Sequence, residues 1–324
     1  MNIVVTGAAG FLGKKLVSAL LAKGSLYNAR GEQQAIRRIT AIDITPLKEF
    51  DDPRLTVLCG DISDPSGLET LIDAHTDTVF HLAAVVSGQA EQDFDLGMKI
   101  NVDATRHIME RLRSLPQCIR LVTTSSVAVF GGQLPDKVPD DQVWMPQSSY
   151  GTQKAINDLL LSDYSRKGFL DGRSLRMPTI VVRPGKPNAA ASSFASGIIR
   201  EPLNGETANC PVAPDTRLWL MSPARAVQAL ISCHELRPDA LDKGRVINLC
   251  GLSVTVEEML ASLRRISGDA VLSRISYQQD PTVSSIVNSW PGDFQADYAN
   301  RLGFKANASF DEMVREYLAE RDAA

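Results

Sequence analysis

The chain begins with a short apolar run, Asn2–Thr6, that leads through a glycine-rich turn into a helical pattern over Phe11–Lys23. Apolar runs that alternate with helical segments are typical of parallel strands buried on both faces of a sheet. The sequence therefore predicts an α/β fold with a doubly wound parallel sheet. Further apolar runs of this kind lie at 38–44, 55–59, 78–83 and 119–124. A sixth strand is expected over Arg176–Arg183, with an irregular start or an edge position because Pro178 falls inside it.

Three glycines occupy the turn between the first strand and the first helix. Gly7, Gly10 and Gly13 have the spacing G-x-x-G-x-x-G. In such a turn one glycine permits the tight bend, a second lets the backbone approach a pyrophosphate, and a third lets helix and strand pack closely. The helix start, at Phe11 and Leu12, would offer unpaired N–H groups to the phosphates. A glycine turn without a ligand is the alternative, but its place in a βαβ unit favours a dinucleotide.

An acidic residue at the end of the second expected strand indicates which dinucleotide the chain would bind. Asp43 stands where a carboxylate can accept hydrogen bonds from the adenosine ribose. Asp43 lies farther from the glycine turn than is usual for this role. We interpret the polar segment 25–34 as a surface insertion that accounts for the extra residues. A carboxylate there would repel a 2′-phosphate, so we expect NAD rather than NADP; a solvated strand-end aspartate is the alternative. Asp61 and Ile62 are candidates for the adenine edge, although a turn or cap role is equally open.

Tyr150 and Lys154 stand at i and i+4, which is one face of a helix. A nearby ammonium and a positively charged nicotinamide would both favour the phenolate and lower the pKa of Tyr150. Ser126 ends the fifth expected strand, at the edge of the sheet where ligands bind. Ser126 could then bond the reacting oxygen while Tyr150 takes or gives its proton. The alternatives are a solvated helix face for the pair and a loop-capping role for the serine.

The surrounding residues extend this pattern. The chain also contains Asn101 and the segments His81-Leu82-Ala83-Ala84 and Ser125-Ser126-x-x-x-Phe130-Gly131. Together these features resemble the extended short-chain dehydrogenases/reductases over nearly the whole chain. The resemblance implies a homodimer, a structural His81 and the catalytic residues Ser126, Tyr150 and Lys154. It also implies that NAD is held by Gly7, Gly10, Gly13, Asp43, Tyr150 and Lys154, with Ala83 and Asn101 nearby.

Two domains are expected on this basis. Residues 1–175 would form a Rossmann-type NAD-binding domain, to which 217–251 returns. Residues 176–216 and 252–324 would form a smaller substrate-binding domain.

The second half of the chain narrows the range of possible substrates. Epimerase-like members of the family carry Tyr-Gly after the serine strand and a His-Val-x-Asp stretch after an arginine. This chain has Phe130-Gly131, and the segment 217–224 keeps Arg217 but lacks the His and the Asp. The segments 181–194 and 222–225 resemble the group of this family that oxidises the C2 hydroxyl of D-erythronate to the 2-oxo acid with NAD. In the implied mechanism Tyr150 is the general base.

A small sugar acid needs a cationic anchor for its carboxylate, and arginine can bind a carboxylate with two hydrogen bonds. Arg183, Arg217 and Arg225 are the candidates, with a surface or structural role as the alternative for each. Hydroxyl groups of the substrate could be bound by Ser192, Ser193 and Asn188.

Composition excludes several other classes of protein. A formal net charge of −4 leaves no basic footprint for nucleic acid. We expect no membrane segment and no signal peptide, and the scattered cysteines and histidines indicate a reducing cytoplasm and no structural metal. Two other functions stay open: a nucleotide-sugar 4-epimerase, and a non-catalytic protein that senses NAD.

Overall fold

The computed structural model describes residues 1–186 and 190–323. Within them, seven parallel strands form a sheet in the order β12-β8-β7-β6-β1-β4-β5. The chain leaves β1 toward β4 on one side and continues from β6 on the other, so the order reverses beside β1. The predicted doubly wound sheet is thus confirmed. The strands are β1 (Asn2–Thr6), β4 (Arg38–Asp43), β5 (Leu55–Cys59), β6 (Thr78–His81), β7 (Arg120–Ser126), β8 (Asp171–Met177) and β12 (Val246–Asn248).

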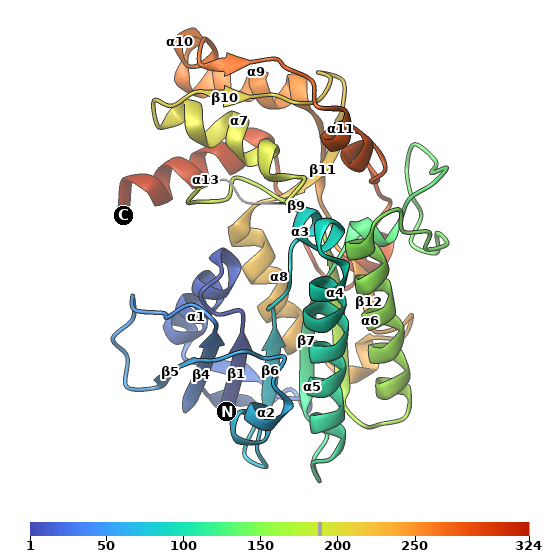
Figure 1. Cartoon of the computed structure of the whole chain (residues 1–324). Helices are drawn as coiled ribbons and strands as arrows, with labels where there is room; N and C mark the ends of the chain where they lie inside the picture. Colours follow the sequence, from blue (N-terminus) through green and yellow to red (C-terminus); the bar gives the residue numbers. More distant parts are fainter. Residues whose placement is uncertain (187–189, 324) are drawn as a thin grey trace.

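Helices cover both faces of this sheet (Figure 1). One face carries α1 (Phe11–Lys23) and α8 (Pro223–Glu235), which pack on each other. The other carries α2 (Pro65–Leu71), α5 (Ala104–Arg113) and α6 (Ser149–Arg166). Two short helices, α3 (Ser87–Gln92) and α4 (Phe94–Gly97), lead into α5 through a π-helical segment, Met98–Asp103.

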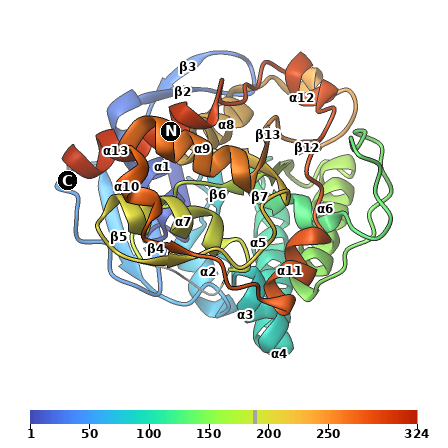
Figure 2. The same cartoon turned by 90° about the horizontal axis from the view of Figure 1, so that it is seen from above.

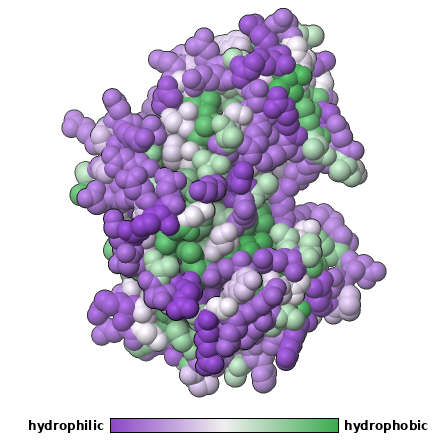
Figure 3. Space-filling model, turned by 180° about the vertical axis from the view of Figure 1, so that it is seen from behind, coloured by the Kyte–Doolittle hydropathy of each residue, from purple (hydrophilic) through white to green (hydrophobic). Residues whose placement is uncertain are grey.

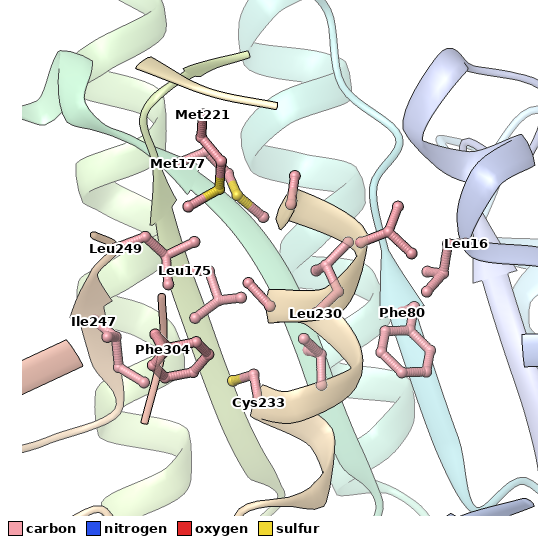
Figure 4. Close-up of a cluster of buried hydrophobic side chains, with 14 of the residues drawn as sticks. Leu16, Phe80, Leu175, Met177, Met221, Leu230, Cys233, Ile247, Leu249 and Phe304 are labelled. Carbon is pink, nitrogen blue, oxygen red and sulfur yellow. The ribbon is translucent and has the colours of Figure 1, made fainter. Parts of the chain in front are cut away.

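The core between the sheet and α8 shows why these residues form layers. Leu230 and Cys233 on α8 face Leu175 on β8, and Phe80 on β6 extends the cluster (Figure 4). All four side chains are fully buried. Burial of such apolar side chains stabilises the fold by roughly 1.5–3 kcal/mol each.

The second part of the chain forms a smaller unit above the carboxyl ends of the strands (Figure 1). Its described residues form a three-stranded sheet, β13-β11-β9, and a two-stranded sheet, β10-β14. These strands are β9 (Thr179–Ile180), β10 (Ala208–Asn209), β11 (Arg217–Met221), β13 (Leu252–Thr255) and β14 (Ile275–Ser276). The helices are α7 (Ser193–Leu203), α9 (Val256–Ser267), α10 (Asp269–Leu272), α11 (Pro281–Asn288) and α13 (Phe310–Ala323), whereas α12 (Asp297–Arg301) packs on β12 and belongs to the core of the main sheet. Figure 2 shows α7, α9 and α10 close together from above.

Strand β11 joins the two parts. Its side chains alternate between two cores, since Leu218 and Leu220 pack with α7 and α9 residues while Trp219 and Met221 pack with the main sheet's core. The return of 217–251 to the first domain is therefore divided: α8 and β12 lie with the seven-stranded sheet, but β11 pairs only outside it within the described chain.

Proline marks the point where the chain changes sheet. We expected one strand over Arg176–Arg183 with an irregular start at Pro178. Instead, β8 ends at Met177 and β9 begins at Thr179 in the other sheet. Proline has no N–H to donate to a ladder, so a strand breaks there readily.

The polar segment 25–34 is a hairpin at the surface, β2 (Ser25–Tyr27) with β3 (Gln33–Ala35). In the part of the chain that the structure describes, no helix is long and apolar enough to cross a membrane. The same residues contain no group of His, Cys, Asp and Glu side chains placed to hold a metal ion.

Candidate active site

The glycine turn is built by close backbone contacts. Gly7 has φ +69°, which favours glycine, and a Cβ on it would lie 2.6 Å from the Ala83 nitrogen. A Cβ on Gly13 would lie 2.1 Å from the Gly7 carbonyl oxygen. Gly10 is the N-cap of α1, and no described side chain caps this helix end. The turn therefore presents N–H groups in a cradle without side chains, which fits the pyrophosphate of a dinucleotide.

A pocket of about 450 Å³ opens beside this turn, between the two parts of the molecule. Seen from behind, the surface has a notch between these parts, and apolar residues reach the surface beside it (Figure 3). The pocket brings together most residues that the sequence singled out. They are Gly7, Gly10, Phe11, Leu12, Gly13, Ser126, Tyr150, Arg183, Ser192 and Ser193.

The residues expected at the adenosine lie outside this pocket lining. Asp43 ends β4 next to the glycine turn, and its carboxylate accepts the N–H groups of Ala9 and Thr45, both at 3.0 Å. Asp61 is exposed and accepts the Ser63 N–H at 2.8 Å, so the turn role is realised. Ile62 is buried in the core under α2 and α5. Contact of Asp43, Asp61 and Ile62 with NAD stays a prediction.

Asn101 lies in the π-helical segment and holds the loop after β6. Its amide oxygen accepts the Val85 N–H at 2.8 Å, and its amide nitrogen donates to the Val85 carbonyl at 3.1 Å and to Gln153 at 2.7 Å. Ala83 in that loop faces Gly7. Asn101 thus positions the loop that closes one side of the glycine cradle.

Tyr150 reaches the pocket because α6 begins very close to the end of β7. The Ser148 hydroxyl caps the helix by accepting the Gly151 N–H at 3.2 Å. A Cβ on Gly151 would lie 2.1 Å from the Ala128 carbonyl oxygen, so the helix start packs backbone against backbone. Ser126 accepts the Ala128 N–H at 3.1 Å and also bonds Tyr150. The capping role of this serine and its place beside Tyr150 therefore coexist.

The electrostatics of Tyr150 differ from the expectation. Burial raises the pKa of Tyr150 to about 12, against the lowering effects of Arg183 and of the Ser126 hydrogen bond. The lowered pKa that the sequence predicted is thus not produced by the protein's own groups, because the desolvation of the phenolate outweighs them. The cation that opposes burial is Arg183 rather than Lys154.

Lys154 lies just behind the pocket wall. Its ammonium donates to the Thr124 carbonyl at 2.7 Å and stands 5.5 Å from the centre of the Tyr150 ring. Burial lowers the pKa of Lys154 to about 8, while Asp158 raises it. His81 is buried between Thr6 (2.7 Å) and Thr105 (2.9 Å), and burial lowers its pKa to about 3, so it is neutral, in keeping with a structural role.

Arg183 is the guanidinium that faces the reacting centre. Its Nε donates to the Ile180 carbonyl at 2.9 Å, one terminal nitrogen donates to the Ser192 hydroxyl at 2.8 Å, and its charge acts on Tyr150. Among the described residues it has no carboxylate within salt-bridge distance. Within residues 1–186 and 190–323, this guanidinium bonds only neutral oxygen atoms.

The other predicted substrate residues lie elsewhere. Arg217 begins β11 outside the pocket lining and donates to Ser253 at 3.3 Å. Arg225 pairs with Glu312 on α13 at 3.4 Å. Asn188 lies outside the described residues.

The pocket residues that sequence reasoning missed include Ser87, Arg200 and Trp290. Arg200 donates to the Arg183 carbonyl at 2.7 Å and forms a buried ion pair with Glu201. It stands seven positions after Ser193, two turns along one helix face, and that spacing was the available signal. Ser87 and Trp290 carry no such local signal.

Comparison with known proteins defines the class. Residues 3–219 match the NAD dependent epimerase/dehydratase family. The chain belongs to this family, and with it to the extended short-chain dehydrogenases/reductases; its cofactor is NAD.

Individual relatives narrow the class further. The chain is 56% identical to D-erythronate dehydrogenase of Cupriavidus necator over 324 residues, the full length of both proteins. It is 44% identical to D-erythronate dehydrogenase of Haemophilus influenzae over 319 residues, covering 98% of this chain and 99% of that one. A crystal structure described as the nucleoside-diphosphate-sugar epimerase from Agrobacterium tumefaciens superposes with a TM-score of 0.93 at 41% identity, covering 100% of this chain and 95% of that chain. The chain is an NAD-dependent dehydrogenase of this family, and the non-catalytic NAD-sensing alternative is set aside.

Proposed function

We propose that this enzyme oxidises the C2 hydroxyl of a small sugar acid with NAD, and that the acid is D-erythronate and the product 2-oxo-D-erythronate. The observation that carries the proposal is Arg183. It is a guanidinium inside the pocket, beside Tyr150, without a carboxylate partner among the described residues. A substrate carboxylate would supply the missing partner and place the adjacent C2 near the phenol.

The neighbourhood of Arg183 is built to hold it still. The Ser196 hydroxyl accepts the backbone N–H of Arg183 at 3.0 Å, and Arg200 donates to the backbone carbonyl of Arg183. Ser192 accepts a hydrogen bond from the guanidinium, so the side chain is oriented before a substrate arrives. Such preorganisation reduces the entropy lost on binding.

The mechanism follows from the positions of the side chains. NAD, when bound, would supply the acceptor for the hydride that leaves the substrate carbon. Tyr150 acts as the phenolate: its oxygen takes the proton of the C2 hydroxyl, and Ser126 donates a hydrogen bond to the same substrate oxygen. Because burial raises the pKa of Tyr150 to about 12, this phenolate would depend on Arg183 and on the positive charge of a bound nicotinamide. Lys154 holds its ammonium at the Thr124 carbonyl, behind the tyrosine, where it would bind the cofactor's ribose, while Arg183 is the cation that lowers the pKa of Tyr150 against burial.

A nucleotide-sugar epimerase is the second candidate, because the structurally similar Agrobacterium tumefaciens protein is so described. The relatives described as D-erythronate dehydrogenases favour the first, since the Cupriavidus necator protein shares 56% of its residues with this chain.

The deciding experiment follows NADH absorbance with purified enzyme, NAD and a panel of four-carbon sugar acids, beside an epimerisation assay on UDP-sugars. NADH formation with D-erythronate, and not with its C2 epimer, is the expected result. Turnover of UDP-sugars alone would remove the sugar-acid assignment.

We also infer a homodimer, on the family resemblance. Sedimentation equilibrium at several concentrations tests it: a single species of twice the 35.2 kDa chain mass is expected.

A further inference from the structure

A buried carboxylate lies behind the reacting residues on the same helix. Asp158 follows Lys154 by one turn and Tyr150 by two turns on α6, and only 1% of its surface is exposed. It accepts hydrogen bonds from the hydroxyls of Ser125 (2.9 Å) and Ser174 (2.6 Å) and from Nε of Arg176 (2.9 Å). No motif in the sequence pointed to this residue.

These bonds join the two elements that must be aligned. Ser125 stands between Thr124, whose carbonyl accepts the Lys154 ammonium, and Ser126, which bonds Tyr150. Asp158 therefore ties the helix that carries Tyr150 and Lys154 to the strand end that carries their partners. A slip of this helix by 1 Å would separate the phenol from the serine hydroxyl.

The carboxylate is itself held by a rigid cation. Arg176 is 2% exposed and lies between aromatic rings, 3.9 Å from the centre of the Trp144 ring and 5.0 Å from that of Phe130. Its Nη1 donates to the amide oxygen of Asn248 at 3.2 Å on the next strand. A buried carboxylate costs several kcal/mol unless it is paired in this way.

The charges around Lys154 give Asp158 a second effect. The groups around Lys154 are the neutral His81 on β6, the Thr124 carbonyl on β7 and the neutral Tyr150 on α6. The positive charge of Arg176, on β8, lies beyond Asp158. Asp158 stands one turn from Lys154 on α6, lines the same small cavity, and its negative charge acts on this ammonium. Burial lowers the pKa of Lys154, and Asp158 opposes that effect.

We propose that Asp158 is a positioning residue for the reaction: it fixes the helix of Tyr150 and Lys154 against the end of β7 and keeps Lys154 in the ammonium form. This proposal rests on the proposed function only for its kinetic part. The charge of Lys154 can be measured without any substrate.

The test compares three variants with the full-length enzyme. Asp158→Asn removes the charge but keeps the shape; Ser125→Ala removes one tie but keeps the charge. Asp163→Asn is the matched control, since Asp163 lies on the same helix, is mostly exposed, and pairs only with Arg166 among the described residues. Melting temperatures of all variants show whether each one folds.

The first readout is competitive acetylation of Lys154 across a pH series, followed by peptide mass spectrometry. In Asp158→Asn the midpoint of Lys154 should move to lower pH by about one unit, a tenfold change in the protonation equilibrium. Ser125→Ala and Asp163→Asn should leave it in place. An unchanged midpoint in folded Asp158→Asn overturns the electrostatic part of the proposal, whether or not D-erythronate is the substrate.

The second readout is the pH profile of NADH formation. With Asp158→Asn the alkaline loss of kcat should begin at lower pH, and kcat should fall about tenfold with a small change in KM. Ser125→Ala should lower kcat without moving the profile. A wild-type enzyme that does not oxidise D-erythronate contradicts the proposed function alone; active, folded variants with wild-type kcat and profile contradict the positioning role.

Discussion

We propose that one side of the pocket holds the cofactor and the other the substrate, and that the two sides recognise these ligands by different means. The cofactor side is backbone: Gly7, Gly10 and Gly13 leave room, and the N–H groups of α1 face the gap. The substrate side is made of side chains, with Arg183 and Ser192 aimed into the space and Arg200 behind them. A backbone site can serve every member of a family that binds one dinucleotide, whereas a side-chain site can be changed one residue at a time.

The largest effect should come from the group that stands between the two sides. Tyr150→Phe removes the phenol oxygen that we propose takes the proton, so kcat should fall by roughly 10²–10⁴-fold while NAD affinity changes far less. Steady-state kinetics and NAD titration by protein fluorescence measure the two quantities. Tyr277→Phe, at an exposed tyrosine, is the control. Comparable activity in both variants would remove Tyr150 from the chemistry.

The backbone side should fail through crowding. Gly13→Ala would place a Cβ 2.1 Å from the Gly7 carbonyl, so we expect a loss of about 1–3 kcal/mol in unfolding free energy and a clear drop in NAD affinity. Urea unfolding and NAD titration measure these effects. Gly67→Ala on α2 is the matched control, because nothing lies within 4 Å of a Cβ there; it should stabilise the protein by about 0.5–1 kcal/mol. Intact NAD binding in Gly13→Ala would contradict the cradle.

The side-chain side should fail through lost charge. Arg183→Gln should raise KM for D-erythronate by roughly 10–100-fold, since a charged hydrogen bond contributes about 1.5–3 kcal/mol. NAD affinity should stay near the wild-type value. Arg217→Gln tests the other arginine, which lies outside the pocket, and KM should not change. The reverse result would exchange the roles of the two arginines.

The last prediction concerns the protein core beneath both sides of the pocket. His81 is buried and neutral, with a pKa lowered from 6.5 to about 3, so the unfolded chain binds its proton first as the pH falls. The stabilisation is complete above pH 6.5 and is lost toward pH 3, with a slope of about 1.4 kcal/mol per pH unit from this residue. His81→Gln should flatten the pH dependence of the unfolding free energy in that window. His75→Gln, at an exposed histidine, should leave it unchanged.

The difference between the backbone side and the side-chain side of the pocket also decides which residues could be predicted from the sequence. The glycine turn, the helix Phe11–Lys23 and the pair Tyr150 and Lys154 are encoded by neighbouring residues, and the structure has that helix with the expected bounds. The substrate side joins segments distant in the chain, so Trp290 and Ser87 could not be placed. Asp158 was missed because its partners come from two strands and become neighbours only through sheet order.

The pKa of Tyr150 is another property that the sequence pattern could not predict. A lysine four residues from a tyrosine indicates proximity, but the pKa of Tyr150 depends on how much water the fold excludes, and burial proved the larger effect. The sequence pattern also indicated one strand where Pro178 divides two, because only the pairing partners show which sheet each half joins.

Strand β11 has a mechanical consequence. Since Leu218 and Leu220 belong to one core and Trp219 and Met221 to the other, neither part can loosen without disturbing the same five residues. The two parts of the molecule are therefore coupled through β11. We expect any opening of the pocket between them to be a rotation about this strand and not a separation at it.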